Sequence, residues 1–477
     1  MAPATLLLLA LGAAAAPAPD RISAPLAEAL SRERGATLAV WVYFKDKGAP
    51  GESPMAAVTP RAASRRRLRA DPGPEDDFEE RLLPRRYVDA VAGRVVRVRH
   101  ELRWFNAVSV DASSEQVASL AALPCVARLD LVRRFRRGAP EPFSPLPAES
   151  APAASAATAS GLDYGSSLGQ LEQIHVPEVH ALGLHGEGVV IAVFDAGFNN
   201  LAHEAFASLH VVAQHDFVNG DDDVGDGNDQ GNGSHGTETL SVLAGFKPGQ
   251  LIGPAYAASF LLAKTENTDS ETPVEEDNWA AAAQWAEAMG VDLISSSLGY
   301  LTFDAPYHSY TYADMDGSTA ASTRAAAAAA ARGVVVVNSA GNEGANAEHN
   351  TLSAPADGRR VVAVGAVDAS GRRTDFSSVG PTADKRRKPD VAAQGQFVKA
   401  ASPLLRHGYG SVDGTSFSCP LTAGVVALVL QAHPAYTVNQ VRSVLHSTAS
   451  QAAHPDNLLG WGIVDALGAV NAPAPPR

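Results

Sequence analysis

Residues 412–430, VDGTSFSCPLTAGVVALVL, decide the fold. A glycine-containing polar turn leads into a long apolar run, and Ser416 stands where the turn enters a helix predicted over residues 420–431. A serine at a helix start faces open space, with unpaired backbone N–H groups nearby. Pro420 suits a first helical turn, which needs no N–H partner. Taken alone, the segment also fits an ordinary helix N-cap, for which Thr415 and Ser418 compete.

Outward from this helix, short apolar runs alternate with helical patterns. The predicted strands are residues 189–194, 259–264, 292–296, 334–338 and 361–367. The other predicted helices are residues 238–244, 274–288, 323–331, 438–448 and 463–470. This alternation predicts an α/β domain with a mostly parallel sheet covered by helices on both faces. In such folds the active site lies at the carboxyl ends of the strands.

Three further segments place chemically competent side chains at strand ends or helix starts. VVIAVFDAGF (189–198) runs a buried strand into Asp195, a carboxylate that needs a partner there. NGSHGTETLSVLAG (232–245) sets His235 at a helix start, and VVVVNSAGNEG (334–344) ends a strand at Asn342, whose amide can donate to an oxyanion. Alone, each has an ordinary explanation: a capping carboxylate, a surface histidine or a turn asparagine.

Together the segments resemble the subtilisin-like serine proteases (subtilases, peptidase family S8). DAG, SHGT, SAGNEG and GTSFSCP follow one another in the Asp–His–Ser order that subtilisin has, over roughly residues 161–470. The resemblance implies a subtilisin-like three-layer domain with Asp195, His235 and Ser416 as the catalytic triad. It also implies Asn342 as an oxyanion donor. DAG in place of DSG or DTG, and Cys419 where serine is usual, are interpreted as subgroup variation.

The resemblance extends to residues expected to bind substrate. SSSLG (295–299) resembles the strand that pairs with substrate in the family, so Ser297, Leu298 and Gly299 are expected to bind an extended peptide. The small residues Ser339, Ala340 and Gly341, with residues 353–355, are expected to line the S1 pocket. This favours a sizeable apolar or aromatic P1 residue.

The N-terminal third predicts export and a propeptide. Residues 1–18 contain an apolar core, LLLLALGAAAA, which is too short to span a bilayer and has alanines suited to signal cleavage. Residues 20–137 predict a small α+β domain whose end, residues 104–131, resembles a subtilase inhibitor-type propeptide. Residues 138–160 are a Pro/Ala/Ser-rich linker open to proteolysis, and residues 161–472 form the catalytic domain. We therefore expect a secreted protein, periplasmic or extracellular, whose partners are peptide substrates and its own propeptide, cut within or near residues 138–165.

Composition limits the other partners. A net charge of −14 disfavours nonspecific binding to nucleic acid, and no stretch after the signal predicts a membrane span. Two cysteines, Cys125 and Cys419, support neither a disulfide scaffold nor a zinc cluster. The basic runs 61–69 (RAASRRRLR) and 132–137 (VRRFRR) either dock on an acidic domain or form separately solvated surfaces, and the sequence leaves both open.

The chemistry predicted here requires no cofactor. A structural calcium ion is possible in the acidic segment of residues 220–229, although a solvated acidic loop is the favoured interpretation. The aspartates concerned are Asp221, Asp222, Asp223, Asp226 and Asp229.

Three alternative functions are weighed against the protease. The main one is a catalytically inactive secreted peptide-binding module on a subtilase scaffold, which the competent residues at all four catalytic positions disfavour. An esterase is disfavoured because the serine lacks a G-x-S-x-G context. A purely structural protein would leave the linker and the propeptide-like module without a purpose.

Overall fold

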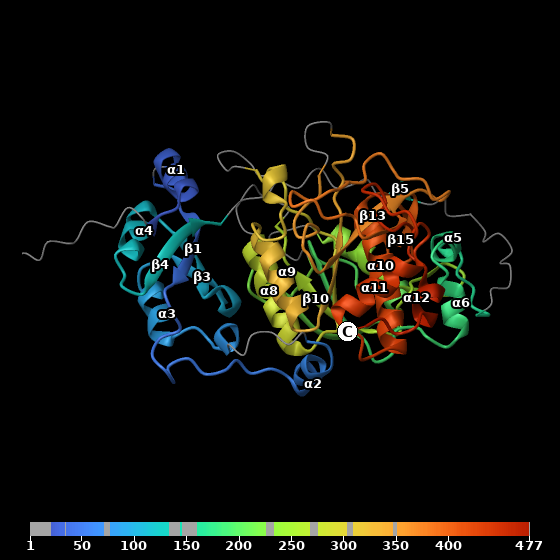
Figure 1. The fold of residues 1–477 in the computed structure, drawn as a ribbon, viewed down its shortest axis with the longest axis horizontal. Helices are drawn as coiled ribbons and strands as arrows, with labels where there is room; N and C mark the ends of the chain where they lie inside the picture. The colour runs from blue at the N-terminus through green and yellow to red at the C-terminus, as the bar shows by residue number, and fades with distance from the viewer. Residues whose placement is uncertain are drawn as a thin grey trace, which may run out of the picture. The chain divides into compact units, whose positions relative to one another are not determined.

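The chain divides into two compact units, residues 1–54 with 81–131 and residues 55–80 with 132–477 (Figure 1). The computed structural model describes residues 21–33, 35–70, 77–132, 144–145, 160–225, 233–267, 275–302, 309–346 and 351–476. The predicted signal peptide and nearly all of the predicted linker lie outside these residues. The division differs from the predicted domain limits at two places: residues 55–80 and residues 132–137, expected in the small N-terminal domain, belong to the larger unit.

The smaller unit is an antiparallel sheet with helices. The strands, in sheet order, are β2 (Arg97–Leu102), β3 (Ala107–Ala112), β1 (Leu38–Phe44) and β4 (Val126–Leu131). The helices are α1 (Ala24–Arg32), α3 (Arg85–Ala92) and α4 (Ser114–Ala121). Val40 lies between Val110 and Leu131 in the centre of the sheet. The continuously apolar sequence of β1 (LAVWVYF) is almost entirely buried, so this strand forms the centre of the core of the smaller unit. A 3-10 turn (Arg103–Phe105) directly precedes β3.

The larger unit is built on a seven-stranded sheet whose neighbouring strands all run parallel. In sheet order the strands are β14 (Val391–Gln394), β13 (Val361–Val367), β12 (Val335–Ser339), β11 (Leu293–Ser296), β6 (Val190–Asp195), β10 (Ser259–Lys264) and β7 (His210–Asp216). Every residue of β6, β11, β12 and β13 is buried, as expected for strands covered on both faces.

Helices cover both faces of this sheet, which confirms the predicted three-layer α/β architecture (Figure 1). On one side pack α7 (Ser234–Ala244), α10 (Thr415–Ala432), α11 (Val438–Thr448) and α12 (Ala466–Asn471); on the other pack α8 (Glu276–Met289) and α9 (Ala321–Ala331). The remaining helices are α2 (Pro60–Arg69), α5 (Leu168–Glu172), α6 (Val176–Ala181) and the 3-10 turns Asp77–Glu80, Glu204–Phe206 and Tyr312–Asp314. The remaining strands are β5 (Ser144–Pro145), β8 (Phe246–Lys247), β9 (Leu251–Ile252), β15 (Val398–Ala401) and β16 (Tyr409–Val412).

Helix α10 forms the centre of the core, and it begins five residues before the predicted start at Pro420. Pro420 therefore lies inside the helix, where it cannot donate to the carbonyl oxygen of Ser416 four residues earlier. The hydroxyl of Ser297 donates to that oxygen instead, at 2.7 Å. An outside donor thus compensates the missing helix bond, and the sequence before Pro420 remains helical.

The apolar side chains of α10 are buried along its whole length. Leu421, Val425 and Leu428 are fully buried, and burial of each such side chain contributes about 1.5–3 kcal/mol. Among the described residues, α10 is the one helix long and apolar enough to cross a bilayer, but 89% of it is buried inside the unit. That burial is characteristic of a core helix.

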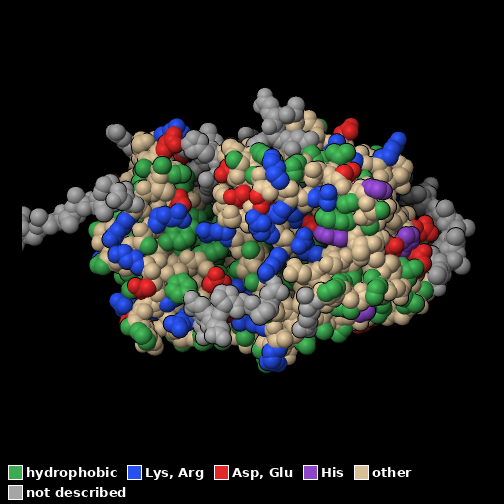
Figure 2. Space-filling view, viewed as in Figure 1, with side chains coloured by type: hydrophobic (Ala, Val, Ile, Leu, Met, Phe, Trp, Pro, Cys, Tyr) green, Lys and Arg blue, Asp and Glu red, His purple; other side chains and the backbone are tan. Residues whose placement is uncertain are grey.

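Charged side chains of both signs are mixed on the surface. On the face drawn in Figure 2, Lys and Arg side chains lie among Asp and Glu side chains on the larger unit. The excess of acidic residues is therefore not gathered on this face into a single acidic patch.

Candidate active site

Asp195 is the last residue of β6, at the carboxyl end of the parallel sheet, and is fully buried. Its Oδ1 accepts from the backbone N–H of Ala196 at 2.7 Å, and its Oδ2 accepts from the hydroxyl of Thr239 at 2.9 Å. Buried charge is tolerated only when it is paired or hydrogen-bonded. These donors hold the carboxylate in one orientation and support its ionised form.

His235 lies in the first turn of α7 and completes the environment of that carboxylate. Its Nδ1 is 2.6 Å from Oδ1 of Asp195. Since a carboxylate accepts, Nδ1 carries the proton, and the basic lone pair of the neutral ring is on Nε2. Gly236 makes this approach possible, because a Cβ there would overlap the carbonyl oxygen of Gly197.

Ser416 is the second residue of α10 and is buried, with 8% of its surface exposed. Its Oγ lies 3.3 Å from the carbonyl oxygen of Ser297. The ring of the next residue, Phe417, lies with its centroid 5.6 Å from that of His235. The imidazole therefore lies against the first turn of α10, so the structure brings Asp195, His235 and Ser416 into one region.

Asn342 follows β12 and is held in a fixed orientation by the start of α10. Its Oδ1 accepts from the backbone N–H of Thr415 at 3.0 Å and from the Thr415 hydroxyl at 2.9 Å. Because these donors occupy the carbonyl end of the amide, Nδ2 is the end that is available to donate. Nδ2 would lie 3.4 Å from a Cβ placed on Gly414, whose φ of 136° also favours glycine.

The predicted substrate-pairing residues follow β11. Leu298 is buried and its carbonyl oxygen accepts from Nδ2 of Asn338 at 2.9 Å, whereas Gly299 is half-buried. A Cβ on Gly299 would lie 2.6 Å from that of Ser353. The segment therefore lies directly beside the residues expected to line the S1 pocket.

The residues predicted for that pocket lie at the end of β12, where Ser339 is the last strand residue, and directly after it. Ser353 donates its N–H to the carbonyl oxygen of Ala340 at 3.0 Å, and Gly341 donates its own to the hydroxyl of Thr415 at 3.2 Å. Ser339 is buried. The structure thus brings Ser339, Ala340 and Gly341 next to the start of α10, while their part in binding stays a prediction.

Sequence reasoning missed two hydroxyl groups of this region. Thr239 lies four residues after His235 in α7, so both side chains project from one helix face, and this spacing could have identified it. The bond from Ser297 to the Ser416 carbonyl joins residues far apart in sequence, and no local pattern marks it.

Cys419 lies one turn after Ser416 but faces away into the core. Its Sγ is 3.4 Å from the carbonyl oxygen of Ser296, and the side chain is fully buried. Burial raises the pKa of the Cys419 thiol to about 12, so the thiol stays protonated and is a poor nucleophile at neutral pH.

No cluster of three or more metal-ligating side chains occurs among the residues that the structure describes. Within the acidic segment, Asp222 is paired with His215 at 2.8 Å, and Asp223 accepts from the N–H of Gly225 at 3.0 Å. Asp226 and Asp229 lie outside the described residues. Calcium binding therefore stays a prediction.

Comparison with known proteins matches both parts of the chain to known families. Residues 186–462 match the model of the subtilase family, and residues 39–143 match that of a peptidase S8 propeptide domain described for Bacteroidota. Subtilisin E of Bacillus subtilis is 29% identical over 294 residues, which are 61% of this chain and 67% of that protein. Subtilisin BL of Lederbergia lenta is 30% identical over 296 residues, which are 62% of this chain and 96% of that protein.

A solved structure shares the fold. Fervidolysin from Fervidobacterium pennivorans, a keratinolytic enzyme related to subtilisin, superposes with a TM-score of 0.64 at 21% identity. The match covers 93% of this chain but 62% of fervidolysin. Since the family model alone matches more than half of the sequence, the chain belongs to the subtilase family, peptidase family S8, and carries a propeptide domain of that family in its N-terminal part.

Proposed function

We propose that this protein is a secreted serine endopeptidase that hydrolyses peptide bonds through Asp195, His235 and Ser416. The observation that carries the proposal is the buried 2.6 Å contact between Asp195 and His235, placed beside the first turn of α10 that holds Ser416. A fixed carboxylate, an imidazole and a serine hydroxyl are the groups that acyl transfer to serine requires.

In the proposed mechanism, Ser416 Oγ turns from the Ser297 carbonyl toward Nε2 of His235 and attacks the peptide carbonyl. His235 accepts the hydroxyl proton and passes it to the leaving amine, and water then hydrolyses the acyl-enzyme by the same route. Asp195 keeps Nδ1 protonated and stabilises the imidazolium that forms. Its bonds from Ala196 and Thr239 limit reorganisation during these steps.

The oxyanion of the tetrahedral intermediate would accept from Nδ2 of Asn342 and from the backbone N–H of Ser416. Thr415 orients the first donor, and the N-terminal end of α10 adds a favourable dipole. An extended substrate would pair with Ser297 and Gly299, because the Leu298 carbonyl is already bonded to Asn338. Ser339, Ala340 and Gly341 would face the P1 side chain.

Activation and export complete the proposal. The propeptide would act as chaperone and inhibitor until the chain is cut within or near residues 138–165. Residues 1–18 would direct the protein across a membrane before removal. The steps need no cofactor, and a calcium ion would contribute to stability only.

The test compares purified wild type with Ser416→Ala. We expect wild type to cleave casein and to convert its precursor, and Ser416→Ala to lose both properties while keeping its circular dichroism spectrum. Mass spectrometry of the products locates the cut. Casein turnover by Ser416→Ala would contradict the assignment of the nucleophile.

The inactive peptide-binding module is the competing proposal. A phosphonate that labels active serines separates the two, because only a serine activated by His235 reacts with it. Wild type that binds peptides without being labelled at Ser416 would favour the module. The competent geometry of Asp195, His235 and Asn342 favours the peptidase.

A further inference from the structure

Helix α2 lies inside the sequence of the propeptide domain, yet it is packed as part of the catalytic unit. The propeptide match spans residues 39–143, whereas residues 55–80 belong to the larger unit. The chain therefore passes between the units three times: after Pro54, after Glu80 and after Leu131. A cut in the linker severs only the third of these connections.

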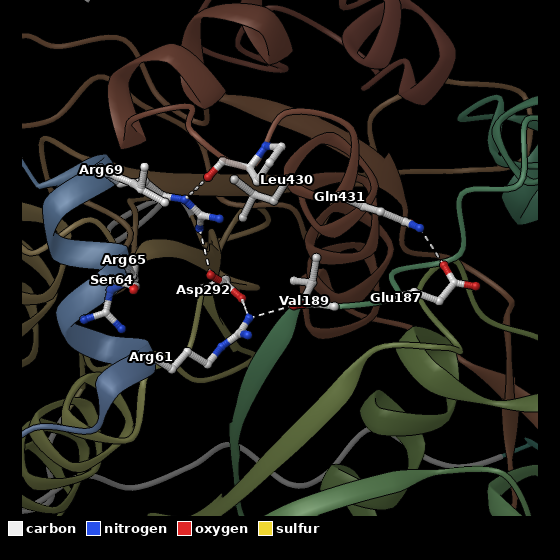
Figure 3. A pocket seen from close by; sticks show the side chains of 12 residues that line it. Arg61, Ser64, Arg65, Arg69, Glu187, Val189, Asp292, Leu430 and Gln431 are labelled. Carbon is white, nitrogen blue, oxygen red and sulfur yellow. Dashed lines mark hydrogen bonds and ion pairs between the residues drawn. The ribbon is translucent and has the colours of Figure 1, made fainter.

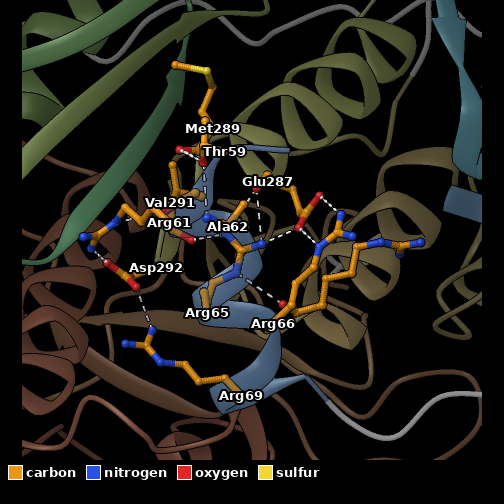
Figure 4. A network of polar contacts seen from close by, with 12 residues as sticks. Thr59, Arg61, Ala62, Arg65, Arg66, Arg69, Glu287, Met289, Val291 and Asp292 are labelled. Atoms are coloured by element: carbon orange, nitrogen blue, oxygen red, sulfur yellow. Dashed lines mark hydrogen bonds and ion pairs between the residues drawn. The ribbon is translucent and has the colours of Figure 1, made fainter. Parts of the chain in front are cut away.

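The arginines of α2 (PRAASRRRLR) form ion pairs with two acidic residues of the catalytic unit (Figure 4). Arg65, with 3% of its surface exposed, pairs with the fully buried Glu287. Arg66 pairs with the same carboxylate at 2.6 Å, and Arg69 pairs with Asp292 at 2.9 Å. The other side of Asp292 is paired with a fourth arginine, Arg61.

The same helix also satisfies the C-terminal carbonyl groups of α8. The N–H and hydroxyl of Thr59 donate to the carbonyl oxygens of Ala288 and Met289, both at 3.0 Å. Arg61 donates to the Gly290 oxygen at 3.0 Å, and Arg65 donates to the Val291 oxygen at 2.7 Å. The last carbonyls of a helix need outside donors, and cations are favoured beside them. Segment 55–80 therefore acts as the C-terminal cap of α8.

Two halves of this contact differ in access to water. A cavity of about 270 Å³ lies beside Arg61, Arg69 and Asp292, and Figure 3 shows these side chains around it. The Arg61 side chain is 43% exposed, so this half of the contact is open to solvent. The pair of Arg65 and Glu287 is buried, with side chains 2% and 0% exposed. Burial lowers the pKa of Arg65 to about 10 although Glu287 and Asp292 raise it, so the guanidinium stays charged at neutral pH.

This contact lies far from the triad. Asp292 immediately precedes β11, whereas Asp195 ends the adjacent strand β6. Strand residues rise about 3.3 Å each, and Asp292 is level with Val190, so the two sites are about 17 Å apart at opposite ends of β6. Substitutions at the arginine contact therefore leave the catalytic residues untouched.

We propose that Glu287, Asp292 and the C-terminal end of α8 form a docking site, remote from the triad, that retains the cleaved propeptide by binding its own arginine helix α2. Cutting the linker does not free the propeptide, because residues 1–54 and 81–131 stay joined to a helix that is seated in the catalytic unit. Departure of α2 would remove the guanidinium groups of Arg65 and Arg66 from Glu287. Removing the partners of a buried carboxylate is strongly unfavourable, because the charge is left uncompensated.

The proposal rests on the proposed propeptide cleavage, and its test is made independent of the enzyme's own activity. A recognition sequence for a site-specific protease is inserted into residues 138–160 of the full-length Ser416→Ala protein, with an affinity tag on the N-terminal part. After the cut, the fraction of catalytic unit retained on the tag is followed with time. Cleavage of a short peptide is measured separately with proteins that keep the native Ser416.

We expect the two fragments of the parent to stay together, and Arg65→Met with Arg69→Met to speed their dissociation about 10²-fold or more. Arg67→Met is the matched control, since Arg67 is exposed on the same helix and, among the described residues, its side-chain bond is to its helix neighbour Ser64 at 2.9 Å. We expect this variant to change the rate less than about twofold. Arg61→Met, whose side chain is 43% exposed, gives an intermediate effect without a risk to folding.

Equal dissociation of the parent and the Arg65/Arg69 variant overturns the proposal, whether both fragments separate at once or both stay together. Circular dichroism and melting of the uncut proteins show whether the double variant folds. If it does not, an unchanged rate in Arg61→Met overturns the proposal by itself. If the protein with the native Ser416 does not cleave the short peptide, the proposed function is refuted, and the retention result still stands.

Discussion

At the scale of single residues, the site depends on amide and hydroxyl groups that hold the reacting groups in place. Asn342 is the clearest case, because the N–H and hydroxyl of Thr415 both donate to its Oδ1. A side-chain amide that must donate to a transient anion gains from such fixation, since no reorganisation is needed when the charge develops.

Asn342→Asp tests this role. The new carboxylate still accepts from Thr415, but it replaces the Nδ2 donor by an oxygen that repels the oxyanion. We expect kcat to fall by about 10²–10³-fold with little change in KM, a magnitude that was obtained on subtilisin. Steady-state kinetics on a peptide substrate measure it. A change confined to KM would assign Asn342 to substrate binding instead.

At the scale of secondary structure elements, long-range hydrogen bonds decide what the sequence could not predict. The strands with continuous apolar runs, such as β6 and β13, were predicted within a residue or two. Strand β7 (HVVAQHD) was missed because it is a half-exposed edge strand without such a run. The start of α10 was placed too late because Pro420 relies on Ser297, more than a hundred residues away.

In the candidate site, too, local motifs could be predicted from the sequence and long-range contacts could not. Asp195, His235, Ser416 and Asn342 could be named because each stands in a short motif at a strand end or helix start. Docking of the basic run 61–69 was one of two alternatives that the sequence left open. Its partners could not be predicted, because α2 is a mostly polar helix whose arginines contact residues more than two hundred positions later. A local pattern gives the charge of such a helix but not the surface that it binds.

The contacts of Glu204 predict how the stability of the fold depends on pH. It joins the 3-10 turn Glu204–Phe206 to β8 through Lys247 at 2.9 Å and to β16 through Tyr409 at 3.0 Å. Burial raises the pKa of Glu204, but hydrogen bonds from Lys247, His407 and Tyr409 outweigh it and lower the pKa to about 2. A depressed pKa stabilises the fold above the unfolded value near 4.5 and loses this effect as the pH falls toward 2.

We therefore expect Glu204→Gln to cost about 1 kcal/mol at pH 7, allowing for partial solvent screening. The deficit should shrink as the pH falls from about 5 toward 2. Denaturant unfolding of both proteins in the Ser416→Ala background measures it, with Glu172→Gln, at an exposed position of α5, as the control. A deficit that is the same at every pH would contradict the assigned ion pair.

At the scale of the whole molecule, the topology of the larger unit makes folding slow. The central strand β6 pairs with β11, which follows about a hundred residues later, and loop closure must precede that pairing. The neighbouring connections of the sheet are also parallel crossovers. A bound propeptide that stabilises α8 and the start of β11 would favour the slow pairing of β11 with β6.

We expect residues 160–477 carrying Ser416→Ala to refold at least about tenfold more slowly than full-length Ser416→Ala. The inactive serine prevents self-digestion in both samples. Recovery of tryptophan fluorescence after dilution from denaturant gives the rates. Equal refolding rates would remove the chaperone function from the propeptide, although an inhibitory function would be unaffected.

The interleaving of residues 55–80 with the larger unit also matters for how the gene is divided. A recombinant enzyme begun near residue 160 would lack the helix that completes its own α8, although the truncation removes nothing from the family-matched segment of residues 186–462. Conversely, an isolated N-terminal fragment would carry a run of arginines without its acidic counterpart. The larger unit of this protein is therefore encoded by two separate stretches of the reading frame.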